Sequence, residues 1–301
     1  MDVLITGGTG FIGRQLVERL GSAYVVTRDL QRARQSKLPT GAQLVGWPDQ
    51  SRPLELPAGV QPTAIVNLMG ESVAGQRWND AFKQRLRSSR IDGTRQLIAG
   101  LRKSGAWPKV FVSASAVGYY GERGDEKLSE TAGPGQGFLA QLAVDWEAAT
   151  APLVAEGVRV VLLRIGIVLG RDGGALAQML PLFRWGLGGR LGSGRQWFPW
   201  IHEQDIVGLI LWALENQAVA GPVNAVAPGC VTNAEFTKAI GRQLGRPTIL
   251  PAPRFGLKLA LGEFADSLLS SQRVVPEVAL RGGYTFHYPD LSQALAELFP
   301  R

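Results

Sequence analysis

The segment TGGTGFIG, residues 6–13, constrains the fold more than any other part of the chain. It joins the apolar run DVLIT to the amphipathic segment FIGRQLVERL, a predicted strand followed by a predicted helix. Gly7, Gly10 and Gly13 are spaced three apart, which suits a tight turn, close approach of a pyrophosphate and close helix–strand packing. The free N–H groups and the dipole at a helix start favour a phosphate. The segment therefore predicts a dinucleotide-binding turn.

More apolar runs follow in the first half of the chain, and they alternate with helical patterns. The runs are residues 23–27, 63–69, 109–115 and 159–169, and the helical patterns cover 11–20, 78–105 and 138–157. Continuous apolar runs rich in β-branched residues are typical of a parallel sheet covered on both faces. We therefore predict an α/β fold, a Rossmann-like doubly wound parallel sheet. The segment 29–62 is rich in Pro and Gly and has no clear pattern.

The composition changes after about Leu169, where Gly- and Trp-rich sequence begins. A helical pattern at 203–216 follows, and Asp205 is its expected N-cap. The segment GPVNAVAP predicts a strand. Thr232 and the glutamate three residues after it form a capping-box pattern at the start of another helix.

Two domains are predicted from this change in composition. The Rossmann domain covers residues 1–169, and a smaller, mixed but mostly helical substrate lobe covers residues 170–301. The segment 205–226 could return to the main sheet, because its helix and strand continue the alternation of the first half. The last stretch, 253–301, has mostly helical patterns.

The end of the second predicted strand indicates which dinucleotide binds. Its sequence VVTRD places Thr27 and Arg28 beside the expected adenosine ribose. A carboxylate there would accept hydrogen bonds from the ribose of NAD, whereas an arginine suits the 2′-phosphate of NADP. Asp29 lies one residue further on and keeps NAD as an alternative, while Arg32 and Arg34 add positive charge. We predict NADP, with NAD less favoured.

Composition argues against several other classes of protein. The chain has 32 basic and 25 acidic residues, a net charge of +7, but the basic residues are dispersed, so we expect no nucleic-acid partner. No apolar run reaches the length of a membrane span, so we expect no membrane partner. The single cysteine, Cys230, and a strand that begins almost at the first residue predict a cytoplasmic protein without a leader. One cysteine and two distant histidines predict no metal site.

Several motifs resemble the extended short-chain dehydrogenase/reductase superfamily, in its epimerase/dehydratase group. They are GGTGFIG, NLMGES at 67–72 and VSASAVGYYG at 112–121. Other segments are similar to an uncharacterised NADP-binding branch of that group, which carries a helical C-terminal domain of unknown function. They are RW…SSRIDGT, WEAA, RIGIVLG, GGRLGSGRQWFPWIH and NAVAP…TNAEF, and they occur in order along essentially the whole chain.

The resemblance implies a set of cofactor-binding residues, carried over by position. They are Gly7, Thr9, Gly10, Phe11, Ile12 and Gly13 at the pyrophosphate, Thr27 and Arg28 at the adenosine phosphate, and Leu68, Met69, Gly70, Arg85, Arg90 and Ser113 beside the rest of the cofactor. Arg164 lies inside an apolar strand. It either contacts the cofactor or is a buried arginine that is paired for structure.

The same resemblance exposes a missing catalytic pair. In the superfamily a tyrosine exchanges a proton with the substrate, and a lysine four residues later lowers its pKa. Ser115 matches the serine that positions the substrate oxygen, with Ser113 as a near alternative. Phe138 and Leu142 stand at the tyrosine and lysine positions, and no tyrosine of the chain has a lysine four residues after it.

Four residues are candidate replacements for the proton donor, each with a structural alternative. Tyr119 and Tyr120 follow Ser115 and could approach the nicotinamide or simply pack in a loop. Glu71 could act as an acid or base if burial raised its pKa, or it could be solvated or paired with an arginine. His202 could donate a proton near neutrality or make a structural hydrogen bond near a helix start.

Two functions of different classes fit these observations. The first is an NADP-dependent oxidoreductase or epimerase-like enzyme with a nonstandard active site, acting on an unidentified small molecule in an apolar pocket. The aromatic residues that could line that pocket are Trp185, Trp197, Phe198 and Trp200, and they could equally belong to the core of the C-terminal lobe. The alternative is an NADP-binding regulator or scaffold without turnover. The superfamily often dimerises through the helices that correspond to 78–103 and 137–156, and the branch that this chain resembles could form such a homodimer or lack it.

Overall fold

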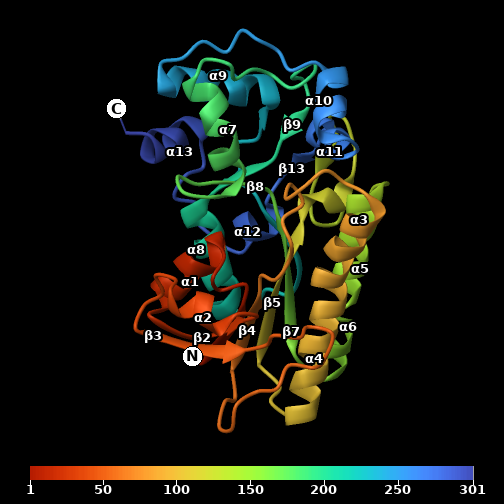
Figure 1. Ribbon diagram of the computed structural model, residues 1–301, viewed down its shortest axis with the longest axis vertical. Helices are drawn as coiled ribbons and strands as arrows, with labels where there is room; N and C mark the ends of the chain where they lie inside the picture. Colours follow the sequence, from red (N-terminus) through yellow and green to blue (C-terminus); the bar gives the residue numbers. More distant parts are fainter. Residues whose placement is uncertain (301) are drawn as a thin grey trace.

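A parallel sheet of seven strands forms the centre of the computed structural model, which describes residues 1–300 (Figure 1). In spatial order the strands are β3 (Gly41–Gly46), β2 (Ser22–Thr27), β1 (Val3–Thr6), β4 (Ala64–Asn67), β5 (Val110–Ala116), β7 (Arg159–Ile165) and β11 (Gly221–Ala225). All neighbouring strands are parallel. The order reverses between β1 and β4, and doubly wound sheets bind ligands at such a reversal. The predicted Rossmann-like fold is confirmed.

Helices cover both faces of the sheet (Figure 1). They are α1 (Phe11–Leu20) and α8 (Glu203–Glu215) on one face, and α4 (Gly93–Ser104), α5 (Phe138–Ala148) and α6 (Ala151–Ala155) on the other. Ile5 of β1 packs with Leu16 of α1, whereas its neighbour Leu4 packs with Leu97 of α4. Alternate strand residues face opposite sides, so strands covered on both faces are apolar throughout.

The long helical pattern at 78–105 is divided in the structure. It forms α3 (Asp80–Arg87), a short π-helix (Ser88–Asp92) and then α4. The Asn79 side chain starts α3 by accepting a hydrogen bond from the Phe82 N–H at 2.8 Å. A π-helical turn is rare and is frequently found at functional sites, and this one places Arg90 beside the end of β4.

The apolar run at 159–169 contains two strands rather than one. β7 ends before Gly166, and β8 (Ile167–Leu169) pairs with β10 (Trp200–His202) outside the main sheet. A Cβ on Gly166 would lie 2.6 Å from the Pro199 carbonyl oxygen, so the chain needs glycine where it leaves the sheet. The weakly patterned segment 29–62 supplies α2 (Leu30–Arg34) and β3, the outer strand.

The C-terminal part packs beyond the carboxyl ends of the strands (Figure 1). Its elements are α7 (Gly174–Arg184), β9 (Trp197–Phe198), β12 (Val231–Thr232), α9 (Asn233–Leu244), α10 (Arg254–Leu261), α11 (Phe264–Leu269), β13 (Arg273–Val274) and α13 (Leu291–Leu298). The short helix α12 (Glu277–Arg281) instead packs against β11 of the main sheet. The segment 205–226 lies with the sheet, because α8 contacts α1 and β11 pairs with β7. Within residues 1–300, no helix is both long and apolar enough to cross a membrane.

Two capping predictions have different outcomes. The capping box of Thr232 and Glu235 at the start of α9 is confirmed. Asp205 as the cap of α8 is wrong, because α8 begins at Glu203 and the His202 side chain caps it. The Asp205 carboxylate is fully buried and instead accepts hydrogen bonds from the N–H groups of His287, at 2.8 Å, and Tyr288, at 2.9 Å.

Candidate cofactor and substrate site

The glycine-rich turn between β1 and α1 is shaped by backbone contacts. Gly7 has φ +70°, and a Cβ there would lie 2.6 Å from the Leu68 carbonyl oxygen. A Cβ on Gly13 would lie 2.2 Å from the Gly7 carbonyl oxygen, which also accepts a hydrogen bond from the Gly10 N–H at 2.9 Å. No side chain caps α1 and no acidic residue lies in its first turn. The first-turn N–H groups have no intrahelical partners and suit a pyrophosphate.

The side chains of the turn point in different directions. Thr9 and Gly10 are exposed, whereas Ile12 packs against the core between the sheet and α1. The Phe11 ring is seated on the loop after β8, since a Cβ on Gly173 would lie 2.2 Å from it. Phe11 and Ile12 therefore offer an anion their backbone N–H groups rather than their side chains.

The exposed Arg28, directly after β2, has no side-chain partner within residues 1–300. The Thr27 hydroxyl accepts a hydrogen bond from the Asp29 N–H at 3.2 Å. The Asp29 carboxylate caps α2 by accepting from the Arg32 N–H at 3.0 Å, so it is already engaged. Arg28 is exposed, and no hydrogen bond or ion pair of its side chain occurs among residues 1–300. The geometry therefore fits a phosphate here better than a ribose bound by Asp29.

The end of β4 lies against the glycine turn and beside a partly buried cation, Arg90. The Leu68 N–H donates to the Thr6 carbonyl at 3.1 Å, and Met69 is buried against Gly93. Gly70 faces the Arg90 guanidinium, which would lie 3.0 Å from a Cβ at that position.

Arg90 binds carbonyl oxygens rather than a carboxylate. Its guanidinium donates to the carbonyls of Glu71, at 2.8 Å, and Leu86, at 3.3 Å, and it lies over the Trp146 ring. Burial lowers the pKa of Arg90 to about 10, and the nearby Glu71 carboxylate opposes that shift. A partly buried cation without a direct ion pair, placed beside Gly70, suits an anionic ligand.

Glu71 pairs with an arginine, which was the structural alternative for it. Its carboxylate lies 3.5 Å from the Arg85 Nε, and both side chains are partly exposed, at 39% and 48%. Its N–H donates to the Ser89 hydroxyl at 3.1 Å.

Ser113 takes part in a buried network inside the sheet. Its hydroxyl accepts a hydrogen bond from the Asn67 amide at 3.2 Å, and Asn67 also contacts Thr6 and Thr94. Ser113 and Asn67 are almost completely buried and are register partners in β5 and β4. Their position indicates that they hold the two strands together below the site.

Ser115 forms a second buried network with two charged residues. Its hydroxyl donates to Glu147 Oε1 of α5 at 2.6 Å. Arg164 is the register partner of Ser115 in β7, and its guanidinium binds both Glu147 oxygens at 2.9 Å. Burial alone would lower the pKa of Arg164, but the hydrogen bonds and charge of Glu147 raise it above its ordinary value. The pairing alternative for Arg164 is therefore the one that the geometry favours.

Tyr120 and Asn224 extend this network to the edge of the sheet. The Tyr120 hydroxyl accepts a hydrogen bond from Arg164 at 3.0 Å and donates to the Asn224 amide oxygen at 2.7 Å. Tyr120 is fully buried, and burial raises its pKa although Arg164 opposes the shift. Tyr119 lies with its ring 3.5 Å from the Arg164 guanidinium and is partly exposed. We call Ser115, Tyr120, Glu147, Arg164 and Asn224 the polar cluster.

His202 is a structural histidine in this fold. It is fully buried and its ring stacks on Tyr288. Its Nδ1 accepts the Gln204 N–H at 3.2 Å, so Nε2 carries the proton and donates to Glu297 at 3.0 Å. Burial lowers the pKa of His202, and Glu297 opposes the shift. With both nitrogens engaged and no exposed surface, His202 has no route to a substrate.

The positions of the missing catalytic pair are apolar in the structure. The Phe138 ring packs edge-on against Trp78, with centroids 5.3 Å apart, and Leu142 is buried in the same core. The four aromatic residues considered for a substrate pocket do not line one pocket together. The Trp197 indole N–H donates to Asp125 at 2.8 Å, and the other three lie elsewhere. Trp200 and Phe198 belong to the C-terminal core, and Trp185 is 82% exposed.

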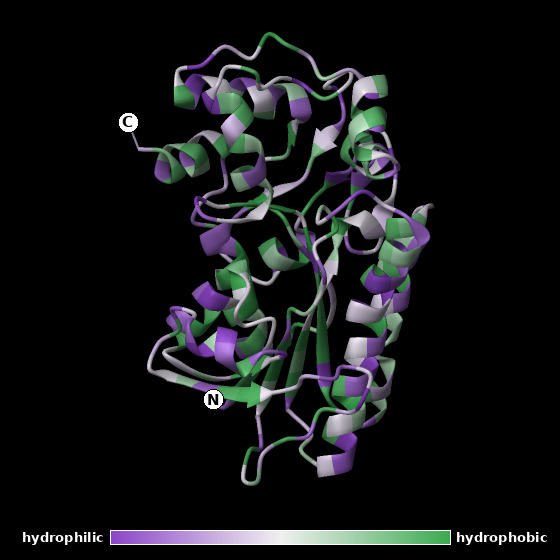
Figure 2. Cartoon of the chain, viewed as in Figure 1, coloured by the Kyte–Doolittle hydropathy of each residue, from purple (hydrophilic) through white to green (hydrophobic). Residues whose placement is uncertain are grey.

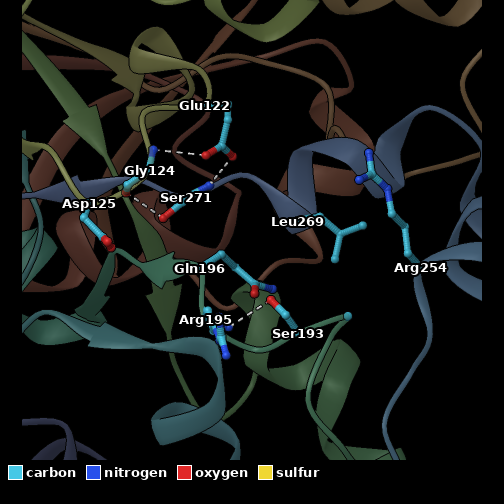
Figure 3. Close-up of a pocket in the computed structure, with 10 residues that line it drawn as sticks. Glu122, Gly124, Asp125, Ser193, Arg195, Gln196, Arg254, Leu269 and Ser271 are labelled. Carbon is cyan, nitrogen blue, oxygen red and sulfur yellow. Dashed lines mark hydrogen bonds between the residues drawn. The ribbon is translucent and has the colours of Figure 1, made fainter.

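A pocket of about 420 Å³ lies between the C-terminal part and the loop that continues from Tyr120 (Figure 3). Its lining residues are Glu122, Gly124, Asp125, Gly192, Ser193, Arg195, Gln196, Arg254, Leu269 and Ser271. The Glu122 carboxylate accepts hydrogen bonds from the N–H groups of Gly124, at 3.0 Å, and Ser271, at 2.6 Å. The pocket therefore carries charges of both signs and several polar groups. Across the described chain, no group of His, Cys, Asp and Glu side chains is arranged to hold a metal ion.

Sequence reasoning missed Glu147 and Asn224. Glu147 is part of the WEAA segment, but nothing local shows that it meets Ser115 and Arg164. Asn224 interrupts an apolar strand, and a polar residue at such a position is the signal that could have marked it.

The chain is similar to two family models and to proteins of known sequence and structure. A model of the NAD dependent epimerase/dehydratase family matches residues 3–226, and a model of a domain of unknown function, DUF1731, matches residues 252–298. An epimerase family protein of Mycobacterium leprae is 43% identical over 98% of this chain and 94% of its own length.

Two solved structures resemble the whole chain. The crystal structure of the human epimerase family protein SDR39U1 with NADPH has 38% sequence identity and a TM-score of 0.87, covering 99% of both chains. A nucleoside-diphosphate sugar epimerase from Corynebacterium glutamicum has 33% identity and a TM-score of 0.78, covering 99% of this chain and 58% of the other.

Proposed function

The chain belongs to the NAD dependent epimerase/dehydratase family, and we propose that it is an NADP(H)-dependent oxidoreductase or epimerase-like enzyme. The observation that carries the proposal is the glycine turn at the reversal of strand order, with the unpaired Arg28 at the end of the next strand. The NADPH found with the human relative supports this choice of cofactor. When bound, NADP(H) supplies or accepts a hydride.

Each part of the sheet edge has a role in this proposal. The first-turn N–H groups of α1 bind the pyrophosphate, and Arg28 binds the 2′-phosphate. Leu68, Met69 and Gly70 form the wall between β1 and β4, with Arg90 behind it. The polar pocket beside the loop after Tyr120 receives the substrate, a small molecule with polar or charged groups.

A second function, an NADP(H)-binding regulator or scaffold, is favoured because most candidate proton donors are buried and hydrogen-bonded. Ser115 donates to Glu147, and Tyr120 and His202 are fully buried, so these hydroxyl and imidazole groups are engaged inside the protein. Only Tyr119 and Glu71 are partly exposed. A regulator or scaffold that binds NADP(H) without turnover needs no proton donor, and this observation fits it.

A turnover screen separates the two functions. The protein is incubated with NADPH and with NADP⁺ in the presence of carbonyl compounds, alcohols and nucleotide sugars, and nicotinamide absorbance is followed. The enzyme proposal expects turnover that Tyr119→Phe or Glu71→Gln reduces without weakening NADPH binding. Tight NADPH binding, with the nicotinamide unaltered after long incubation with cell extract, supports the regulator.

A further inference from the structure

Two segments of the C-terminal part form one surface at the end of the molecule opposite β1, β2 and β3 (Figure 1). The segments are residues 182–191 and 245–261. They run side by side, because the Ala252 N–H donates to the Arg190 carbonyl at 2.9 Å and the Gly192 N–H donates to the Ala252 carbonyl at 2.8 Å. We call these two segments the distal surface.

Large apolar side chains on the distal surface are exposed. The most exposed are Trp185 at 82%, Ile249 at 81%, Leu259 at 77% and Phe255 at 76%, and Leu182, Leu187 and Leu250 are each more than half exposed. Figure 2 shows a hydrophobic stretch at the crest of the loop from α9 to α10. Gathered apolar side chains of this kind usually mark an interaction site.

Helix α10 shows the same feature within a single element. It is amphipathic, and none of its residues is buried. Phe255 and Leu259 lie one turn apart on the helix, and the basic Arg254 and Lys258 precede them by one position each. An apolar stripe beside basic side chains is typical of helices that lie at a membrane interface.

The charge of the distal surface is positive. Its two segments contain Arg184, Arg190, Arg246, Arg254 and Lys258, and they contain no acidic residue. A carboxylate from α11, Asp266, pairs with Arg254 at 3.3 Å and Lys258 at 3.1 Å. A symmetric dimer through this surface would bring the basic groups of two copies together. Charge therefore disfavours a second copy and favours an anionic partner.

We propose that the distal surface binds the anionic face of a lipid membrane. The apolar side chains enter the boundary between headgroups and acyl chains, and the basic side chains contact lipid phosphates. The sequence-based expectation of no membrane partner rested on the length of the apolar runs, which bears on a membrane span. The proposal replaces that expectation with a reversible surface contact. It is independent of the proposed cofactor chemistry.

Vesicle co-sedimentation tests the proposal. We expect the wild-type protein to bind vesicles of phosphatidylcholine mixed with phosphatidylglycerol and to bind pure phosphatidylcholine vesicles much less. Trp185→Ser with Ile249→Ser should lower the partition coefficient about tenfold or more, because two large apolar side chains no longer enter the interface. Arg184→Gln with Arg246→Gln should lower it about tenfold on the anionic vesicles, and high salt should act in the same direction.

The matched controls place equal changes elsewhere on the molecule. Val154→Ser with Leu280→Ser removes two other apolar side chains, which are 64% and 51% exposed, and should leave vesicle binding unchanged. Each variant should keep the circular dichroism and NADPH affinity of the wild type. Absent binding to anionic vesicles, equal binding to both vesicle types, or binding that the serine pair does not weaken would overturn the proposal. A wild-type dimer that the serine pair makes monomeric would assign the surface to a second copy instead.

Discussion

The glycine turn and the polar cluster lie at the same edge of the sheet, yet they hold their polar groups in opposite ways. The turn presents backbone N–H groups at the start of α1 that have no intrahelical partner and no side-chain cap. In the polar cluster, each side chain already has a partner within the protein. The turn therefore has free N–H donors for a ligand, whereas the side chains of the polar cluster bond to one another.

We therefore expect cofactor binding at the turn to be independent of the side chains of the polar cluster. Backbone donors are fixed by glycine geometry and persist when nearby side chains change. Side-chain chemistry depends on which hydroxyl or carboxylate remains accessible, and here the Ser115 hydroxyl donates to Glu147, which is itself paired with Arg164. We therefore expect mutations in the polar cluster to lower the free energy of unfolding, and mutations in the glycine turn to lower the affinity for NADPH.

The largest expected effect comes from breaking the cluster. Glu147→Ala leaves Arg164 buried without its carboxylate, so the free energy of unfolding should fall by about 3–5 kcal/mol. Urea unfolding followed by circular dichroism measures it. NADPH affinity under folding conditions should change little. A Glu147→Gln protein that keeps its stability but loses turnover would contradict the structural role and make the cluster catalytic.

The second largest effect is expected from a substitution in the glycine turn. Gly13→Ala adds a Cβ that would lie only 2.2 Å from the Gly7 carbonyl oxygen. The turn and α1 must therefore move apart. We expect NADPH affinity to fall about a hundredfold, because small displacements of a positioned site have effects of this size. Calorimetric titration measures the affinity. Gly133→Ala is the matched control, since an added Cβ there meets no atom within 4 Å and the backbone φ is not positive, and it should bind NADPH normally.

The contrast between the regions also explains what the sequence could predict. The glycine turn depends on residues within one short segment, so spacing alone identified it. The cluster depends on register across three strands, in which Ser115, Arg164 and Asn224 come from distant segments and become neighbours. The rotation of α5 then decides whether Glu147 faces them. Local patterns contain neither the register nor the rotation.

His202 illustrates a related limit of sequence reasoning. A histidine in a Gly- and Trp-rich segment is compatible with both a proton donor and a structural residue. Only the fold shows that Glu297, 95 residues away, and the Gln204 N–H occupy both ring nitrogens. The identity of a residue is local, but its accessibility is a property of tertiary packing.

The smallest expected effect is a pH dependence at this buried histidine. Its folded pKa is lowered, so it binds a proton more readily when unfolded, and stability is lost as pH falls below the unfolded value near 6.5. Relative to His202→Gln, the wild type should lose stability more steeply from pH 7 to pH 5, by at most about 1.4 kcal/mol per pH unit. Equal slopes in urea unfolding for the two proteins would show that His202 does not titrate as described.

A paired titration of the wild-type protein with NADPH and NADH tests most directly whether the protein binds NADP(H) and whether Arg28 selects it. We predict that NADPH binds at least about tenfold more tightly, because a charged contact to the 2′-phosphate is made by Arg28. Arg28→Ala should remove this preference, while Lys37→Ala, the same charge change at another exposed position, should preserve it. Equal affinities for the two nucleotides in the wild type, or no binding of either, would contradict the binding of NADP(H) at the glycine turn with selection by Arg28.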